Sequence, residues 1–352
     1  MIINNLGLFL CSFLSLFIFR KIAIFINLVD EPNSRKHHAG SVPLVGGLAV
    51  FVVVFSYLFV FPETISSSML YLICASILLF IGVLDDLYDI SFRFRLILQI
   101  VISALMMCFG GLIFNDIGAL FGGTSINLSY FGYIMTVIVV VGAINAFNMV
   151  DGIDGLLGAL ATITFTSLGI LFYFNGQNEL MAFCAAIVVA TVPYILMNLG
   201  IPLGQRFKIF MGDAGSTVIG FTVVWLLLEG SQSQEKSAFS PVTALWLAAV
   251  PIIDAISTIA RRIKKGQSPF KPDREHLHHI LLRLGFSSRQ ALVVICFIST
   301  VFATVGIVTD IYNVPDYIMF YSFLLCTIMY YFFMLRIWRI SVHIRRFFGT
   351  NR

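Results

Sequence analysis

The sequence predicts an all-α, polytopic integral membrane protein that forms one domain over residues 1–352. Hydrophobic residues make up 59% of the chain and charged residues only 11%, whereas about a quarter of the residues in a soluble domain are charged. Mean hydropathy is +0.95, and the apolar residues gather in runs long enough to cross a bilayer. We therefore expect a protein that works in the bilayer and does not bind nucleic acid.

Eleven apolar runs are candidate spanning helices, several of them at the short end of the usual length. We expect the first run to be retained, because no basic residue precedes it and no small-residue cleavage site follows it. The six cysteines lie inside apolar runs without a CxxC pair, so they are interpreted as buried apolar residues. The runs cover residues 3–26, 44–61, 68–84, 96–114, 131–147, 156–174, 179–197, 215–229, 241–260, 291–309 and 316–337.

Basic residues are distributed very unevenly between the connections. Of the 22 Lys and Arg, 21 follow odd-numbered runs or lie near the ends of those runs on the same side, and Lys236 alone follows an even-numbered run. Because positive charge is retained in the cytoplasm, we expect the N-terminus outside and the C-terminus in the cytoplasm. The split also favours an odd number of spans. So basic a face suits anionic lipid headgroups and phosphorylated substrates.

Five cytoplasmic loops carry the residues that suggest chemistry, at about 27–43, 85–95, 148–155, 198–214 and 261–290. In the first of them, Lys36 belongs to a basic cluster that precedes Gly46-Gly47 at the start of the second run. Two interpretations remain open for this loop. It could hold phosphate, or it could be a positive-inside anchor followed by a helix-breaking proline.

Paired acids at the ends of apolar runs are the clearest functional signal. Asp151 and Asp154 lie three residues apart and share a face if their turn is helical, and Asp85-Asp86 end the third run. A lone aspartate would be an ordinary solvated loop residue. Two pairs at a membrane surface repel one another and need a cation or a proton. Magnesium, which takes oxygen ligands, is the natural partner.

A further acid, Asp213, lies among small residues where the eighth run opens. The N–H groups at such an opening can bind an anion, and the carboxylate can hold a metal beside them.

Three histidines, His276, His278 and His279, fall in the longest and most basic loop. Zinc is disfavoured, because neither cysteine nor an HExxH motif accompanies them. We interpret them as donors to phosphate oxygens, with ordinary surface residues as the alternative. Asp254, seven residues before Arg261, is interpreted as its structural partner, with a functional role as the alternative.

Carboxylates, a divalent ion and cationic groups on one face are what phosphoryl transfer requires. The membrane location implies that one substrate is a lipid. A transporter would hold its acids near the bilayer midplane, whereas these acids lie at segment ends. A structural scaffold would leave the acid and histidine clusters without a purpose.

These residues resemble the motifs of the polyprenyl-phosphate N-acetylhexosamine-1-phosphate transferases, in the same order and over nearly the whole chain. Within that superfamily the chain is most similar to the bacterial branch that starts O-antigen and enterobacterial common antigen synthesis, because it has His-Leu-His-His where the peptidoglycan branch has three consecutive histidines. Asp89 stands where that branch has lysine, so no role of the lysine carries over. The matching segments are Pro43–Gly47, Asp85-Asp86, Asn148–Gly155, Asn198–Pro202, Phe210–Ser216 and Asp273–His279.

The resemblance implies that UDP-N-acetylglucosamine and undecaprenyl phosphate give a lipid-linked sugar diphosphate and UMP, with magnesium or manganese, at the cytoplasmic face of the bacterial inner membrane. Another UDP-N-acetylhexosamine or a muramoyl-pentapeptide donor remains an alternative. Direct attack is favoured over a covalent intermediate, and a homo-oligomer is left open. The implied site residues are Asp213 and Asp86 at the metal, Asp85, Asp86, Asp151 and His276 in catalysis, and Lys36, Asn148, Asp154, Asn198, Phe210, Arg261, His278 and His279 in substrate binding.

Overall fold

The computed structural model of the protein describes residues 2–31, 40–233, 237–269 and 275–347. Within these ranges the only strands are the two-residue β1 (Val29–Asp30) and β2 (Val42–Pro43), so the predicted all-α class is confirmed. The helices are α1 (Ile2–Phe25), α2 (Gly46–Val60), α3 (Ser68–Tyr88), α4 (Phe92–Gly110), α5 (Phe131–Val150), α6 (Leu156–Phe174), α7 (Asn178–Asn198), α8 (Gly212–Ser231), α9 (Pro241–Leu247), α10 (Ala249–Lys264), α11 (Leu277–Arg283), α12 (Ser288–Ile311) and α13 (Asp316–Phe347).

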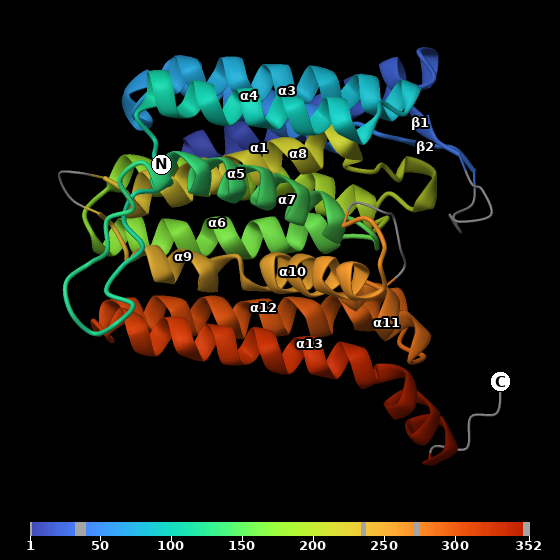
Figure 1. The fold of residues 1–352 in the computed structure, drawn as a ribbon. Coiled ribbons are helices and arrows are strands. Elements are labelled where there is room, and N and C mark those ends of the chain that lie inside the picture. Colours follow the sequence, from blue (N-terminus) through green and yellow to red (C-terminus); the bar gives the residue numbers. More distant parts are fainter. Residues whose placement is uncertain (1, 32–39, 234–236, 270–274, 348–352) are drawn as a thin grey trace.

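Most of the long helices run side by side, with α3 and α4 at one edge of the bundle and α12 and α13 at the other (Figure 1). The strands and α11 lie at the same end of the bundle, and the N-terminus lies at the opposite end. The C-terminal end of α13 extends beyond the end that carries α11. Helix α1 therefore begins at one end of the bundle, and α13 ends at the other.

The eleven predicted runs all form helix, but they are not eleven equal spans. Among the described residues, nine helices are long and apolar enough to cross a membrane. The second run forms α2, which is apolar but has only 15 residues. The ninth run is not one continuous helix: α9 and α10 meet at an angle of 85°, and together they count as a tenth span only if the bent pair crosses the membrane.

Pro251 explains the break in the ninth run. Proline has no N–H to offer the carbonyl four residues earlier, and its ring crowds that carbonyl. The carbonyl concerned is that of Leu247, the last residue of α9, and it accepts a hydrogen bond from the Thr164 hydroxyl at 3.2 Å. Ala248 separates the two helices with φ −116° and ψ 28°.

Helix α8 is the buried centre of the bundle. In its apolar window 94% of the residues are buried, and it packs against α2, α3, α5 and α6. Small residues allow the backbones to approach closely, as in other membrane helix pairs. A Cβ on Gly47 of α2 would lie 2.1 Å from the Cα of Gly215, and one on Gly82 of α3 would lie 2.3 Å from the Cα of Ala214.

Two short backbone pairings fix the loop before α8. β1 and β2 pair antiparallel, with Val29 opposite Pro43. The Phe210 N–H then donates to the Pro43 carbonyl at 2.9 Å, and the Phe210 carbonyl accepts from the Gly46 N–H at 2.9 Å. Phe210 and the start of α8 are thereby held against the start of α2. Lys36, between the strands in sequence, lies outside the described residues.

The close approach of α2 and α8 predicts an unequal response to two Gly→Ala substitutions. Gly47→Ala should destabilise the protein by ~1–3 kcal/mol, because the methyl group would overlap backbone that cannot move aside cheaply. Gly142→Ala in α5 is the matched control, since nothing lies within 4 Å of its Cβ position. Removing a helical glycine there should be neutral or stabilising by up to ~1 kcal/mol. Thermal unfolding in detergent measures both, and equal midpoints would contradict the packing described.

Candidate active site

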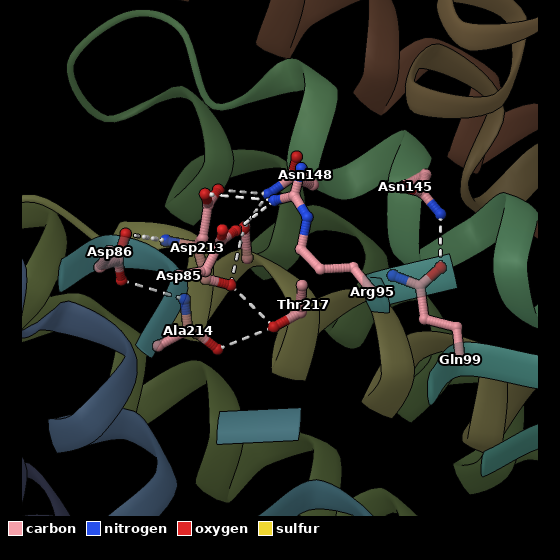
Figure 2. Close-up of polar contacts among 10 residues, drawn as sticks. Asp85, Asp86, Arg95, Gln99, Asn145, Asn148, Asp213, Ala214 and Thr217 are labelled. Atoms are coloured by element: carbon pink, nitrogen blue, oxygen red, sulfur yellow. Dashed lines mark hydrogen bonds and ion pairs between the residues drawn. The ribbon is translucent and has the colours of Figure 1, made fainter. Parts of the chain in front are cut away.

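Three of the aspartates singled out in the sequence, Asp85, Asp86 and Asp213, lie close together beside Asn148 and Arg95 (Figure 2). Asp85 and Asp86 come from the last turn of α3, Asn148 from the last turn of α5, and Asp213 from the first turn of α8. The carboxyl ends of α3 and α5 carry partial negative charge, so acids there are electrostatically unfavourable without a cation. Such a cost points to a functional arrangement.

Asp86 holds the first turn of α8. Its carboxylate accepts the Asp213 N–H at 2.9 Å and the Ala214 N–H at 3.3 Å. These are N–H groups that a helix leaves without internal partners, so Asp86 acts as a cap supplied by another helix. Gly212 makes room for it, because a Cβ there would lie 2.6 Å from Oδ2 of Asp86 and its φ is +75°.

Asn148 orients the carboxylate of Asp213. Its amide nitrogen donates to Oδ1 of Asp213 at 2.6 Å and lies 2.8 Å from the hydroxyl of Ser216. The Asp213 side chain is still 40% exposed. It is thus held in place while remaining open to a ligand from solvent.

Arg95, in the first turn of α4, is a site residue that the sequence analysis did not select. Its Nη1 pairs with Oδ2 of the buried Asp85 and lies 3.4 Å from Oδ2 of Asp213. Its Nε is buried and has no hydrogen-bond partner in the described part of the chain. The signal was available in the sequence, as a basic residue directly before the fourth apolar run and ten residues after an acid of the Asp85-Asp86 pair.

The loop between α5 and α6 supplies the second acid pair. Solvent reaches Asp151, yet protein surrounds the carboxyl group. This burial, together with the negative charges of Asp213 and Asp154, raises its pKa to about 7. Asp154 pairs with Nζ of Lys208 at 2.8 Å, and the same ammonium lies 5.1 Å from the centre of the Phe210 ring. Lys208, also not selected from sequence, therefore joins Asp154 to Phe210, which was predicted to bind substrate.

Asn198 lies beneath the site. It is 2% exposed, its oxygen accepts the Gly155 N–H, and its nitrogen donates to the Ile209 carbonyl at 2.7 Å. Both ends of the amide are thus used to tie the 198–214 loop to the start of α6. Asn198 thereby fixes the backbone next to Asp154 and Phe210.

The histidines reach the site through His278. This ring is 2% exposed, and a Cβ on Gly152 would lie 2.0 Å from its Nε2. That Nε2 is buried and without a hydrogen-bond partner among the described residues. Burial, and then the charges of His279 and His276, lower the pKa of His278 to about 3, so the ring is neutral at pH 7.

Asp254 does not pair with Arg261, so that interpretation of the sequence was wrong. Its carboxylate accepts from Nδ1 of His276 at 2.8 Å, the Leu277 N–H at 3.1 Å and the Tyr330 hydroxyl at 2.6 Å. The pairing depends on the turn that brings residues 275–279 back against α10, which helical spacing alone does not predict.

Arg261 is 4% exposed and makes its contacts inside the protein. It donates to the Glu275 carbonyl at 2.6 Å and to the Thr258 hydroxyl at 2.9 Å, and it lies 3.3 Å from the Glu275 carboxylate. In this arrangement it joins α10 to the histidine segment. Its predicted contact with a diphosphate stays a prediction.

The donor set fits a magnesium-type ion better than zinc. Five aspartates face two cations here, so negative charge is in excess. In the described ranges no three His, Cys, Asp or Glu side chains converge closely enough to hold a metal by themselves. Magnesium does not require such a cage, since one or two carboxylates, waters and substrate phosphates complete its shell. The exposed Asp213 suits that role.

Comparison with known proteins identifies the family. Residues 68–231 match the model of glycosyl transferase family 4. The chain is 46% identical over 342 residues to the undecaprenyl-phosphate alpha-N-acetylglucosaminyl 1-phosphate transferase of Salmonella typhi, covering 97% of this chain and 93% of that protein. This chain belongs to that transferase family. Family members of the same name in Yersinia pestis and Haemophilus influenzae are 46% and 44% identical, over 97% and 96% of this chain.

The contact between Gly152 and His278 predicts a loss of transferase activity without unfolding. Gly152→Ala would place a methyl group where Nε2 of His278 lies, so the ring and the 151–155 loop would have to separate. We expect kcat/KM to fall by ~10-fold or more, because small displacements of positioned groups are costly to catalysis. Gly123→Ala, where nothing lies within 4 Å of the Cβ position, should retain wild-type activity. Equal activity of the two variants would show that this contact is not needed.

Proposed function

We propose that the protein transfers N-acetylglucosamine-1-phosphate from UDP-N-acetylglucosamine to undecaprenyl phosphate and releases UMP. The observation that carries the proposal is the cluster of aspartates at the ends of α3, α5 and α8, in a chain 46% identical to transferases of that name. We place this end of the bundle at the cytoplasmic face of the bacterial inner membrane, because 21 of the 22 basic residues belong to that side.

In this reaction an oxygen of the lipid phosphate attacks the phosphorus that carries the sugar. The bond from that phosphorus to the bridging oxygen breaks, and UMP leaves with the bridging oxygen. Asp151 has a pKa of about 7, close to the second pKa of about 6 of a phosphate monoester. It can therefore accept the proton from a monoprotonated acceptor and return it to solvent.

Asp213 would hold magnesium or manganese, with Asp86 fixing the peptide that carries it. The bound ion would neutralise diphosphate charge and polarise the phosphorus under attack. Asn148 keeps the Asp213 carboxylate oriented. Asp85 holds Arg95 at the rim of the cluster, where the guanidinium can contact phosphate oxygens in a bidentate manner.

Lys208, Asp154 and Phe210 form the second wall of the proposed donor site. The ring of Phe210 offers a surface on which uracil can stack, and Lys208 holds Asp154 beside that ring. The ring of His278 lies against Gly152, two residues from Asp154, and packs beside the ring of His279. Neutral or charged imidazoles there can donate to the diphosphate.

The donor can be tested directly with purified wild-type protein. UMP release should be efficient with UDP-N-acetylglucosamine and undecaprenyl phosphate. UMP release should be absent when either substrate is omitted. A hydrolase, in contrast, would release UMP without the lipid. The UDP-muramoyl-pentapeptide donor should be used poorly. Preference for the pentapeptide donor, or flux across a vesicle membrane without UMP release, would overturn the proposal.

Asp213→Asn should abolish turnover at limiting magnesium while the thermal midpoint stays close to that of the wild type, because a charged metal ligand is lost and the hydrogen bonds to its peptide remain. Asp89→Asn provides a matched control. Asp89 is exposed, with φ +52° at the end of α3, a conformation that asparagine adopts readily. Steady-state UMP release across a magnesium titration compares them. Equal magnesium dependence in both variants would remove Asp213 from the metal site.

A further inference from the structure

Asp254 is a carboxylate buried deep inside the protein without a lysine or arginine among its hydrogen-bond partners in the described residues. It lies on α10, is 2% exposed and has the apolar Ile253 and Ala255 as neighbours in the chain, both also buried. Moving an ionised carboxylate out of water costs several kcal/mol unless hydrogen bonds and charge compensate. A buried carboxylate retained despite this free-energy cost is a candidate for a functional role.

The three donors to Asp254 come from two other segments of the chain. The His276 ring and the Leu277 N–H lie just before and in α11, and the Tyr330 hydroxyl lies on α13. Of these groups, only His276 can carry a full positive charge near neutral pH. The carboxylate and the imidazole are thus a buried acid–base pair, with Tyr330 and Leu277 fixing the position of the acid.

This pairing determines how the His276 ring is used. An ionised carboxylate can only accept, so Nδ1 of His276 carries the hydrogen and the ring plane is fixed. Any contact with substrate has to use Nε2, on the far side of the ring.

His276 is connected to the aspartate cluster through a second ring. The rings of His276 and His278 are parallel, with centroids 5.8 Å apart and an interplanar angle of 4°, and His278 lies against Gly152. The orientation that Asp254 gives to the His276 ring therefore affects how His278 packs against Gly152, in the loop that carries Asp151 and Asp154.

We propose that Asp254 is a positioning residue for the transferase reaction: it fixes the tautomer and orientation of His276, so that Nε2 is presented to the diphosphate of the nucleotide-sugar donor. The proposal deepens the function proposed above and rests on it for the identity of the donor. It also gives α10 and α13 a part in the site, although neither supplies one of the clustered aspartates.

A double-mutant cycle tests the proposal in the full-length protein. Asp254→Asn is nearly isosteric, but its amide can donate to Nδ1 and so favours the other tautomer. We expect kcat for UMP release to fall by ~10- to 100-fold, with a smaller change in KM for UDP-N-acetylglucosamine. In a His276→Ala background the same substitution should have an effect of no more than about twofold, because the residue it acts through is gone.

Asp310→Asn provides the matched control. Asp310 is another partly buried carboxylate that accepts from the Ser240 N–H at 3.0 Å and the Thr243 hydroxyl at 2.6 Å, on α12 outside the site. It should lower the thermal midpoint to a similar extent while leaving kcat near the wild-type value. Equal losses from Asp254→Asn in the presence and absence of His276, or an equal loss of kcat in Asp310→Asn, would overturn the proposal.

A second measurement does not depend on the donor. Nitrogen-15 shifts of histidine-labelled protein report the tautomer of His276, whose signal is assigned by its loss in His276→Ala. The wild type should show hydrogen on Nδ1, and Asp254→Asn should change that signal. Hydrogen on Nε2 alone in the wild type would overturn the positioning role even if UDP-N-acetylglucosamine is the substrate. A correct tautomer in a protein that does not release UMP would instead contradict the proposed function.

Discussion

The cap that Asp86 provides at the start of α8 is the interaction on which the rest of the site depends. It joins α3 to α8 through the N–H groups of Asp213 and Ala214, beside the contact between Gly82 and Ala214. Because Asp213 sits on that first turn, its carboxylate can be placed only where Asp86 holds the helix. Asn148 then completes the placement from α5. Asp86 and Asp213 thus have different roles: Asp86 caps the start of α8, and Asp213 is exposed to ligands.

Most of the fold could be predicted from sequence because lipid leaves few choices for an apolar segment. All eleven runs form helix, and α1 begins at the end of the bundle opposite to the one where α13 ends. The break between α9 and α10 was missed, although Pro251 marks it, because total apolar length says nothing about where a helix bends. The loop before Gly46-Gly47 was interpreted as a phosphate site or as a positive-inside anchor, and helix packing was not considered. The approach of α2 to α8 at Gly47 shows that packing requires these glycines.

The site was predictable where residue type and position along a helix were sufficient. Asp85, Asp86, Asn148 and Asp213 do meet, because helix ends on one face of a bundle must be neighbours. Partners distant in sequence were not predictable. Arg95 joins the cluster from a different helix, and Asp254 pairs with His276 instead of Arg261 because the chain turns back after α10. Sequence spacing predicts which residues share a helix face, but it does not predict which loop returns to that face.

The side of the site formed by α2 and α8 is stiffer than the side formed by α10 and α11, because of the glycines of α2 and α8. On the α8 side, backbone touches backbone at Gly47 and Gly215, so any sliding would create overlap at once. On the α10–α11 side, the segment is held by hydrogen bonds from Arg261 and to Asp254. The bonds of Arg261 to Glu275 can be exchanged for bonds to phosphate oxygens, whereas backbone overlap can be relieved only by moving whole helices. Adjustment to a bound nucleotide sugar is therefore expected around Arg261 and Glu275, while His276 stays held by Asp254 and the aspartates on α3 and α8 keep their positions.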